Sequence, residues 1–468
     1  MKSFFFPLSI IICLVVLTSS CKKNSFITSP DAQLTISADT LKYDTVFTSI
    51  GSVTKSFKIS NVNSQKLKLT RVKLMGGNSS PFRININGQA TTEVDDLEME
   101  ANDSIYVFVS VTINPNLSSL PFIISDSILV SYNGNNIFVQ LQAFGQNANF
   151  LRNRVITGNV TWANNLPYVI LGSIRIDSSA VLTIQPGCRI YSHADAPFIV
   201  DGTLVVNGTK PDSVIFTGDR LDADYKDLPA SWPGIYFRGS SRNNVLKYAL
   251  IKNAYQAVVA EKPSSNAPVA KLILHQCIID NAYDAGLLGV NTSLQADNSL
   301  ITNCGSNIVL SYGGEYNLTH CTVASFSTLY INHHNPVMQV SNAALQNGMI
   351  VTASLNAVFR NCIFWGEAGQ VDDEVPVNKQ GATSFSVLFD HSLYRAMNDP
   401  ANSTLTACIK NQYPSFDSID VYRKIFDFHI TKNAAAPGIN KGNTITQNTR
   451  DLDNKLRTNI PDLGCYEK

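Results

Sequence analysis

Four aspartates gather in one short stretch of the sequence and are the first candidates for chemistry. They lie in residues 218–227, at Asp219, Asp222, Asp224 and Asp227. Calcium takes six to eight oxygen ligands, and closely spaced carboxylates in a loop can supply several of them. The stretch lacks the Asp-x-Asp-x-Asp-Gly spacing of a dedicated calcium loop. We therefore expect a solvated turn, with Asp219, Asp222 and Asp224 as candidate ligand contacts and calcium as the one cofactor suggested.

Two other groups of side chains could support catalysis or metal binding. A glycosidase needs two carboxyl groups facing one cleft, and Asp372-Asp373-Glu374 brings three together before Val375-Pro376. Because acidic runs are usually solvated, we expect an exposed turn there. His333-His334 is an isolated pair in an expected loop, without further metal ligands near it in sequence. The sequence therefore predicts no catalytic residue and no metal site.

Aromatic side chains near turns are what a sugar-binding groove requires, because ring faces stack on pyranose faces. Five of them lie near expected turns of the second half of the chain: Trp232, Tyr236, Tyr255, Tyr283 and Tyr312. Tyrosine and tryptophan also pack well in cores and interfaces. Each taken singly is therefore interpreted as structural, and Trp232 is kept as a candidate ligand contact.

A repeat of short strands must position these side chains. Residues 245–253 align with residues 273–281 and 295–303, and weaker copies follow. One small residue recurs in every copy: Ala249, Cys277, Ser299, Cys321, Cys362 and Ser392. The shortest interval, 22 residues, is about one coil of a parallel β-helix, and longer intervals indicate inserted loops. A leucine-rich solenoid would need recurrent leucines, and a β-propeller would need about twice this period.

Three positions of each repeat carry specific expectations. The small residue should sit inside a bend where only a compact side chain fits. Four residues later, Asn253, Asn281 and Asn303 should adopt the left-handed backbone of a tight turn and bond one another between coils. The position before the small residue holds His320 and His391, with Tyr248, Gln276, Asn298 and Asn361 in other copies. We expect this position to point outward as a polar strip that binds glycan or is solvated.

The first part of the chain reads as a separate domain. Residues 33–147 contain about seven short alternating or β-branched runs. The sharpest pair, residues 128–132 and 137–141, flanks Asn133-Gly134, which is a strong hairpin signal. We predict an all-β chain: an N-terminal immunoglobulin-like (Ig-like) β-sandwich over residues 33–147, followed by a right-handed single-stranded parallel β-helix over residues 150–468 with a C-terminal capping segment.

The N-terminus has the marks of an export signal. Lys2 precedes an apolar run over residues 4–17, which is too short for a permanent membrane anchor. The run ends at Thr18-Ser19-Ser20-Cys21, which resembles a bacterial lipobox whose cysteine is lipidated. Leu17 lies one position further from Cys21 than the usual pattern. We expect a signal peptide over residues 1–21, lipid attachment at Cys21, and a tether over residues 22–32.

The composition of the chain argues against a nucleic-acid partner and against a disulfide framework. Lysine plus arginine and aspartate plus glutamate both number 36, so no cationic surface for nucleic acid is expected. Charged residues make up only 15% of the chain, which is typical of extracellular all-β proteins. Beyond Cys21, seven widely spaced cysteines follow without a CxxC pair. They are interpreted mostly as buried thiols rather than as a disulfide framework.

The second half resembles the right-handed β-helix repeat lipoproteins of Bacteroidetes, a largely uncharacterised family. The resemblance rests on residues 182–187 (Leu-Thr-Ile-Gln-Pro-Gly), 200–204 (Val-Asp-Gly-Thr-Leu), 232–235 (Trp-Pro-Gly-Ile) and the closing segment 451–467. Pro233 stands where the family usually has Gly, and Cys465 where it usually has Ala. The resemblance implies the fold and an outer-membrane, lipid-anchored location on the periplasmic or the outer face. It says little about activity, because the same fold carries lyases, hydrolases, adhesins and inert scaffolds.

Three functions from different classes fit this sequence. The first is non-catalytic binding of a polysaccharide or an envelope protein on the β-helix, with the membrane reached only through the lipid anchor. The second is a polysaccharide lyase or glycoside hydrolase that works on the same face. The third is a structural spacer without a ligand.

Overall fold

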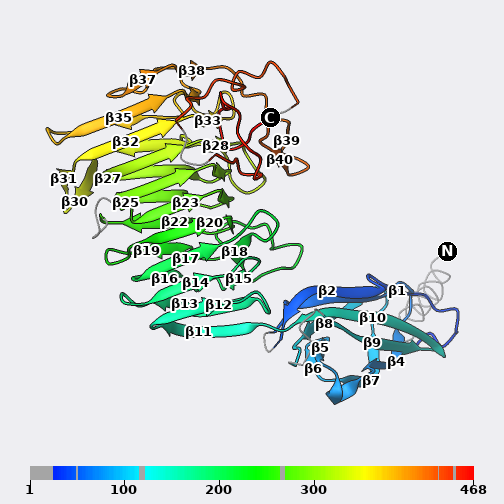
Figure 1. Ribbon diagram of the computed structural model, residues 1–468. Helices are drawn as coiled ribbons and strands as arrows, with labels where there is room; N and C mark the ends of the chain where they lie inside the picture. Colours follow the sequence, from blue (N-terminus) through cyan, green and yellow to red (C-terminus); the bar gives the residue numbers. More distant parts are fainter. Residues whose placement is uncertain (1–24, 49–50, 115–121, 264–268, 431, 446–448) are drawn as a thin grey trace, which may run out of the picture. The chain divides into compact units, whose positions relative to one another are not determined.

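Alternating apolar residues make most segments of this chain β-strands (Figure 1). The computed structural model describes residues 25–48, 51–114, 122–263, 269–430, 432–445 and 449–468. The predicted lipidation site, Cys21, lies outside these residues. The chain divides into two compact units, residues 1–147 and 148–468. No helix within the described ranges has the length and apolarity that crossing a membrane requires.

The first unit is a β-sandwich, as predicted, and its described residues form two five-stranded sheets where about seven strands were expected. One sheet has the order β1 (Leu34–Ile36), β3 (Lys55–Asn61), β8 (Ser104–Val111), β5 (Phe82–Ile86) and β6 (Gln89–Ala90). The other has the order β2 (Thr40–Phe47), β10 (Asn135–Gln146), β9 (Phe122–Tyr132), β4 (Leu67–Leu74) and β7 (Glu93–Met99). The inward side chains of both sheets form one apolar core. The Asn133-Gly134 hairpin is confirmed, because both residues have positive φ, 42° and 82°, and join β9 to β10.

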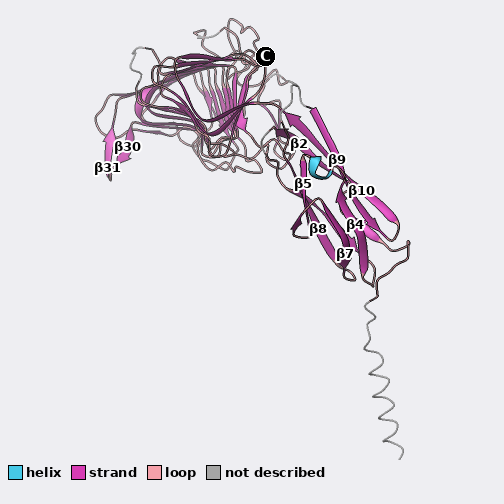
Figure 2. Ribbon diagram, turned by 90° about the horizontal axis from the view of Figure 1, so that it is seen from below, coloured by secondary structure: helices cyan, strands magenta, loops and turns pink. Residues whose placement is uncertain are grey.

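The second unit is a parallel β-helix, which confirms the predicted fold class. Its 26 strands pair between successive coils in parallel register and form three faces. Face 1 runs through β13 (Tyr168–Ile176), β16 (Phe198–Val200), β19 (Ile235–Phe237), β22 (Gln256–Glu261), β25 (Ala285–Asp297), β27 (Ser306–Thr319), β29 (Met338–Ser341) and β34 (Val377–Asn378). Figure 2 looks into the stack from one end.

Faces 2 and 3 complete each coil. Face 2 runs through β12 (Asn159–Trp162), β14 (Val181–Ile184), β17 (Thr203–Asn207), β20 (Asn244–Lys247), β23 (Leu272–His275), the second halves of β25 and β27, β32 (Leu355–Arg360), β35 (Phe385–Asp390) and β37 (Thr404–Thr406). Face 3 begins with the first half of β13 and runs through β15 (Arg189–Ser192), β18 (Val214–Gly218), β21 (Ala249–Lys252), β24 (Ile278–Asp280), β26 (Leu300–Thr302), β28 (Thr322–Ser325), β33 (Ile363–Gly366), β36 (Leu393–Tyr394) and β38 (Ile409–Lys410). The first strand, β11 (Asn149–Ile156), pairs with β13.

The predicted column of small residues is confirmed. Its six members lie at the start of face 3, point inward and are at most 1% exposed. Side chains link successive coils: the Cys277 amide donates to Ser299 Oγ at 3.1 Å. The strand register extends the column to Cys408, and in the other direction through Val214, a larger residue, to Cys188; the repeat pattern alone did not reveal these positions. All seven described cysteines are free thiols, and six of them are buried.

The asparagine turn is confirmed as well. Asn253, Asn281 and Asn303 have φ of 62°, 57° and 52° and end three strands of face 3. The predicted bond between coils is present in one of two steps: the Asn281 side-chain amide donates to Asn253 Oδ1 at 2.8 Å, whereas Asn303 Oδ1 accepts from the Phe326 amide at 3.1 Å. We call these three residues the asparagine ladder.

From β21 onward, the outer side of face 3 is covered by the C-terminal segment, which the structure describes over residues 412–430, 432–445 and 449–468. Outward apolar side chains of face 3 pack in one cluster with Phe416, Phe428, Leu463 and Cys465. Within this segment, β39 (Ser418–Asp420) and β40 (Ile425–Asp427) form a short hairpin. A second hairpin, β30 (Ala343–Gln346) and β31 (Met349–Thr352), projects from the stack (Figure 2).

The predicted outward polar strip is wrong, because the C-terminal segment buries most of it. The Gln276 side chain donates to the Asp451 carbonyl at 2.7 Å. Asn298 Oδ1 accepts from Arg457 Nε at 3.0 Å. His320 is fully buried, and its neighbour Asn361 accepts from the Gly464 amide at 2.8 Å through its carbonyl. The strand period marked this row as outward but could not show that a later segment lies over it.

Candidate functional site

The acidic loop does not gather its carboxylates. Asp219 lies 2.7 Å from His193 Nδ1, and burial raises the pKa of its carboxyl group. Asp222 pairs with Arg220 at 3.1 Å, while Asp224 is exposed. Within the described residues, no three side chains of His, Cys, Asp or Glu converge as metal ligands would. The candidate contacts Asp219, Asp222 and Asp224 therefore stand apart from one another.

Of three other residues considered in the sequence, Trp232 and Glu374 are buried and His391 is partly exposed. Trp232 is 1% exposed, and its indole nitrogen donates to the Lys252 carbonyl at 2.8 Å. His391 is partly exposed and lies 2.6 Å from Asp390. The expectation of an exposed acidic turn is wrong for Glu374, which is fully buried and lies 2.9 Å from His333 Nε2. Burial of this carboxylate is balanced by charge-assisted bonds, which include one from Arg395 at 3.3 Å.

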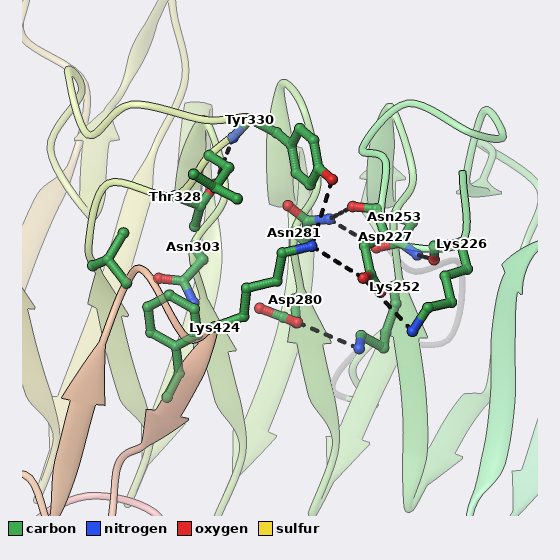
Figure 3. A pocket seen from close by; sticks show the side chains of 13 residues that line it. Lys226, Asp227, Lys252, Asn253, Asp280, Asn281, Asn303, Thr328, Tyr330 and Lys424 are labelled. Carbon is green, nitrogen blue, oxygen red and sulfur yellow. Dashed lines mark hydrogen bonds and ion pairs between the residues drawn. The ribbon is translucent and has the colours of Figure 1, made fainter. Parts of the chain in front are cut away.

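A pocket of about 330 Å³ opens where face 3 turns into face 1 (Figure 3). Its floor is the asparagine ladder together with Lys252 and Asp280, the last residues of β21 and β24. Three segments form its walls: the loop after β18 with Lys226 and Asp227, the loop after β28 with residues 328–330, and the β39–β40 hairpin with Val421, Lys424 and Phe426. The pocket is therefore a gap in the cover of face 3.

The asparagine ladder holds one wall of this pocket in place. Asn253 Nδ2 donates to the Lys226 carbonyl at 2.8 Å, and Asn281 Nδ2 donates to the Asp227 carbonyl at 2.9 Å. Both amides thus bind the loop that the sequence presented as a calcium candidate. These two hydrogen bonds hold the backbone of the loop against the asparagine turns of the next two coils, and so the loop forms a wall of the pocket.

Five charged side chains line the pocket and form ion pairs with one another. Lys424 Nζ lies 3.2 Å from Asp227 Oδ2, and Lys226 Nζ lies 3.8 Å from the same atom. Lys252 pairs with Asp280 at 3.8 Å. Burial raises the pKa of the Asp280 carboxyl group, whereas the bond to Asp227 raises the pKa of Lys424. Three ammonium groups thus face two carboxylates.

An exposed aromatic pair lies on the other side of the asparagine turn. Tyr255 and Tyr283 follow the ladder asparagines by two residues, and their rings stack at 5.9 Å with an angle of 25°. They are 45% and 54% exposed. The equivalent position of the next coil is Gly305, which has no side chain to stack on Tyr283. Of the five aromatics considered in the sequence, the structure joins only these two in a ring contact.

The sequence singled out the ladder asparagines and Asp227, but not the other charged residues of the pocket, Lys226, Lys252, Asp280 and Lys424. One signal was present: a charged or polar residue, Lys252, Asp280 or Thr302, precedes each ladder asparagine, and period two points it outward. No pattern connected these residues to Lys424, which lies far along the chain. Its hairpin reaches the ladder only in three dimensions.

Comparison with known proteins supports the fold of the second unit. Residues 154–263 match the family model described as "Pectate-lyase like beta helix domain". No curated protein matches this chain.

Solved structures resemble only a part of the chain. A family 123 glycoside hydrolase from Clostridium perfringens is 11% identical over 27% of this chain and 30% of its own, with a TM-score of 0.18. A PapD-like domain of human CEP192 is 9% identical over 26% of this chain and 96% of its own, with a TM-score of 0.18. A protein of unknown function from Porphyromonas gingivalis is 11% identical over 27% and 60%, with a TM-score of 0.19.

These structural likenesses are too slight to carry an argument about activity. The family model and the continuous parallel sheet agree with each other. The chain therefore carries a parallel β-helix domain of the pectate-lyase-like type.

Proposed function

We propose that this protein binds an extended glycan without cleaving it, on the edge of the β-helix that carries Tyr255 and Tyr283. The stacked, half-exposed pair of rings is the observation that carries this proposal. Ring faces and edges of this kind pack against the apolar faces of sugar rings. The pocket of about 330 Å³ is lined by Asn253 and Asn281, two residues before these tyrosines, and its volume is within the range of small-ligand sites. A coil-by-coil repeat also suits a polymeric ligand, because both are periodic along one axis.

Binding measurements on the protein without residues 1–21 test this proposal. The wild type should retain oligosaccharides from a glycan array, and the double variant Y255A/Y283A should bind the same oligosaccharides at least tenfold more weakly. That loss corresponds to about 1.4 kcal/mol, which is modest for two aromatic contacts. Y106A is the matched control, because Tyr106 is 49% exposed in the first unit. Equal binding by wild type and Y255A/Y283A would contradict the assignment of this edge.

Catalysis by the same pocket is the second candidate function. It is favoured by Asp280, whose raised pKa is what a general acid requires. Asp227 would be the second carboxylate, but both carboxylates pair with lysines. A lyase would release unsaturated ends and a hydrolase would release reducing ends from a polysaccharide. Either product, with loss of its release in D280N, would replace binding by catalysis as the function.

The anchored location belongs to the same proposal. Cys21 and the preceding Thr18-Ser19-Ser20 support lipidation and retention at the outer membrane. The wild type should partition with membranes, whereas C21S should be released in soluble form. Protease treatment of intact cells then distinguishes the outer face from the periplasmic face.

A further inference from the structure

Lysines from three distant parts of the chain meet in the pocket beside the asparagine ladder. Lys226 comes from the loop after β18, Lys252 from the end of β21, and Lys424 from the turn of the β39–β40 hairpin. Figure 3 shows all three reaching into the same gap. In a chain with equal numbers of acidic and basic residues, three lysines in one pocket are a local excess of positive charge.

Lys424 is held in an unfavourable backbone conformation. Its φ is 56°, in the left-handed region that asparagine and glycine adopt more readily than lysine. From there its ammonium group lies over the Tyr330 ring, 5.2 Å from the centroid, and 3.2 Å from Asp227. The turn thus places this ammonium group beside the carboxylate of Asp227 in the pocket.

Asp227 receives two of the three lysines. Its Oδ2 atom lies between Lys226 and Lys424, at 3.8 Å and 3.2 Å (Figure 3). The side chains of Asp227 and Lys424 are 39% and 44% exposed. Exposed pairs of this kind are weak and exchange readily with other ions. An anion that enters the pocket can therefore take over both lysines.

We propose that the pocket binds an anionic group of the glycan, a carboxylate or a sulfate, which displaces the Asp227 carboxylate from Lys226 and Lys424. This inference rests on the proposed glycan binding and names its chemical class. Lys252 and Asp280 stay paired on the floor, so the bound anion neutralises the two lysines of the walls. Tyr255 and Tyr283 hold the neighbouring sugar rings.

The two partners of the Lys424–Asp227 pair therefore have opposite effects on binding. K424N removes a cation while placing asparagine where the backbone favours it, and should weaken binding of the acidic ligand about 10- to 100-fold. D227N removes the competing anion and should strengthen binding about two- to fivefold. A pair with a purely structural role would not give opposite signs.

Lys262 supplies a matched control for the lysine variant. It is an exposed lysine with φ of 63°, and it lies after β22 outside the pocket. K262N therefore makes the same substitution in the same backbone conformation. It should leave binding unchanged.

Calorimetric titration with three trisaccharides of one linkage type tests the inference: a neutral one, a uronate-containing one and a sulfated one. The wild type should bind one of the acidic trisaccharides at least tenfold more tightly than the neutral one, and the preferred acid identifies the group. Neutral and acidic ligands bound with equal affinity would overturn the inference and leave glycan binding intact. Equal weakening by K424N and D227N would also overturn it. If none of the three binds, the proposed function fails and this inference with it.

Discussion

The buried guanidinium of Arg457 should hold the C-terminal segment on the β-helix. Its side chain is 2% exposed and lies 3.1 Å from Glu467 Oε2, whose side chain is 1% exposed. It also donates to Asn298 Oδ1 in the buried polar row and to the Gly464 carbonyl. Replacing Arg457 by methionine keeps much of the volume but leaves the Glu467 charge buried without its cation.

The expected cost follows from that burial. Removing one partner of a buried ion pair lowers stability by about 3–5 kcal/mol. Arg457 and Glu467 both lie in the C-terminal segment. We therefore expect the lost stability to appear first as local opening of this segment, before the β-helix unfolds. At about 1.4 kcal/mol for each factor of ten, the open fraction should rise at least about 100-fold.

Cys465 supplies the assay. It is fully buried in this segment, and burial raises the pKa of its thiol to about 12, so it reacts only when the segment opens. Its labelling by a thiol reagent, followed by mass spectrometry of peptides, should accelerate at least about 100-fold in R457M, while Cys188 in the inner core serves as the internal control. The double variant R457M/E467Q should label more slowly than R457M, since no buried charge is stranded. Unchanged Cys465 labelling in R457M would refute the reasoning.

Four further variants, at three places, probe the β-helix itself. In the column of small residues, C362L should lower the free energy of unfolding by about 1–3 kcal/mol through overpacking, whereas C362S should cost less because serine occupies equivalent positions; denaturant titration decides, and equal costs would contradict the column. K271M should cost at least about 2 kcal/mol, because the buried Lys271 ammonium donates to the carbonyls of Arg238, Gly239 and Glu261 at 2.9–3.0 Å. Burial lowers the pKa of Lys271 from 10.5 to about 8, so the unfolded chain binds more protons than the folded chain between these pH values. The free energy of unfolding of the wild type should therefore rise relative to that of K271M from pH 7 to pH 10. A difference that narrows over this range would contradict the lowered pKa. The double variant L345S/I350S should change stability by less than about 0.5 kcal/mol, because both side chains are more than 60% exposed on the β30–β31 hairpin, and a clear drop in melting temperature would show that they are packed.

The fold was largely predictable because it depends on local and periodic signals. A small residue in the bend of most coils and an asparagine four positions later in three of them are steric preferences of one bend and one turn, so Ala249, Cys277 and Asn281 can be recognised in the sequence. The Asn133-Gly134 hairpin is equally local. Cys188 and Cys408 escaped notice because their repeats are too degenerate to align without the strand register.

The candidate site could not be predicted in the same way, because it depends on contacts between distant segments. His320 and Asn298 lie in an outward phase, but residues 451–468 cover them. Lys424 meets Asp227 although 197 positions separate them. The repeat period of the sequence predicts how each coil stacks on the next. It does not predict contacts between the coils and a non-repeating segment far along the chain.

The position of the C-terminal segment has a consequence for how the chain is made. The residues that it covers, among them Gln276, Asn298 and His320, are synthesised well before Arg457 and Glu467. Until the C-terminal segment is made, the outer side of face 3 in the early coils must therefore be exposed to solvent. A chain truncated before residue 451 would keep this side of the β-helix exposed. Proteases that do not cleave the full-length protein should cleave such a product.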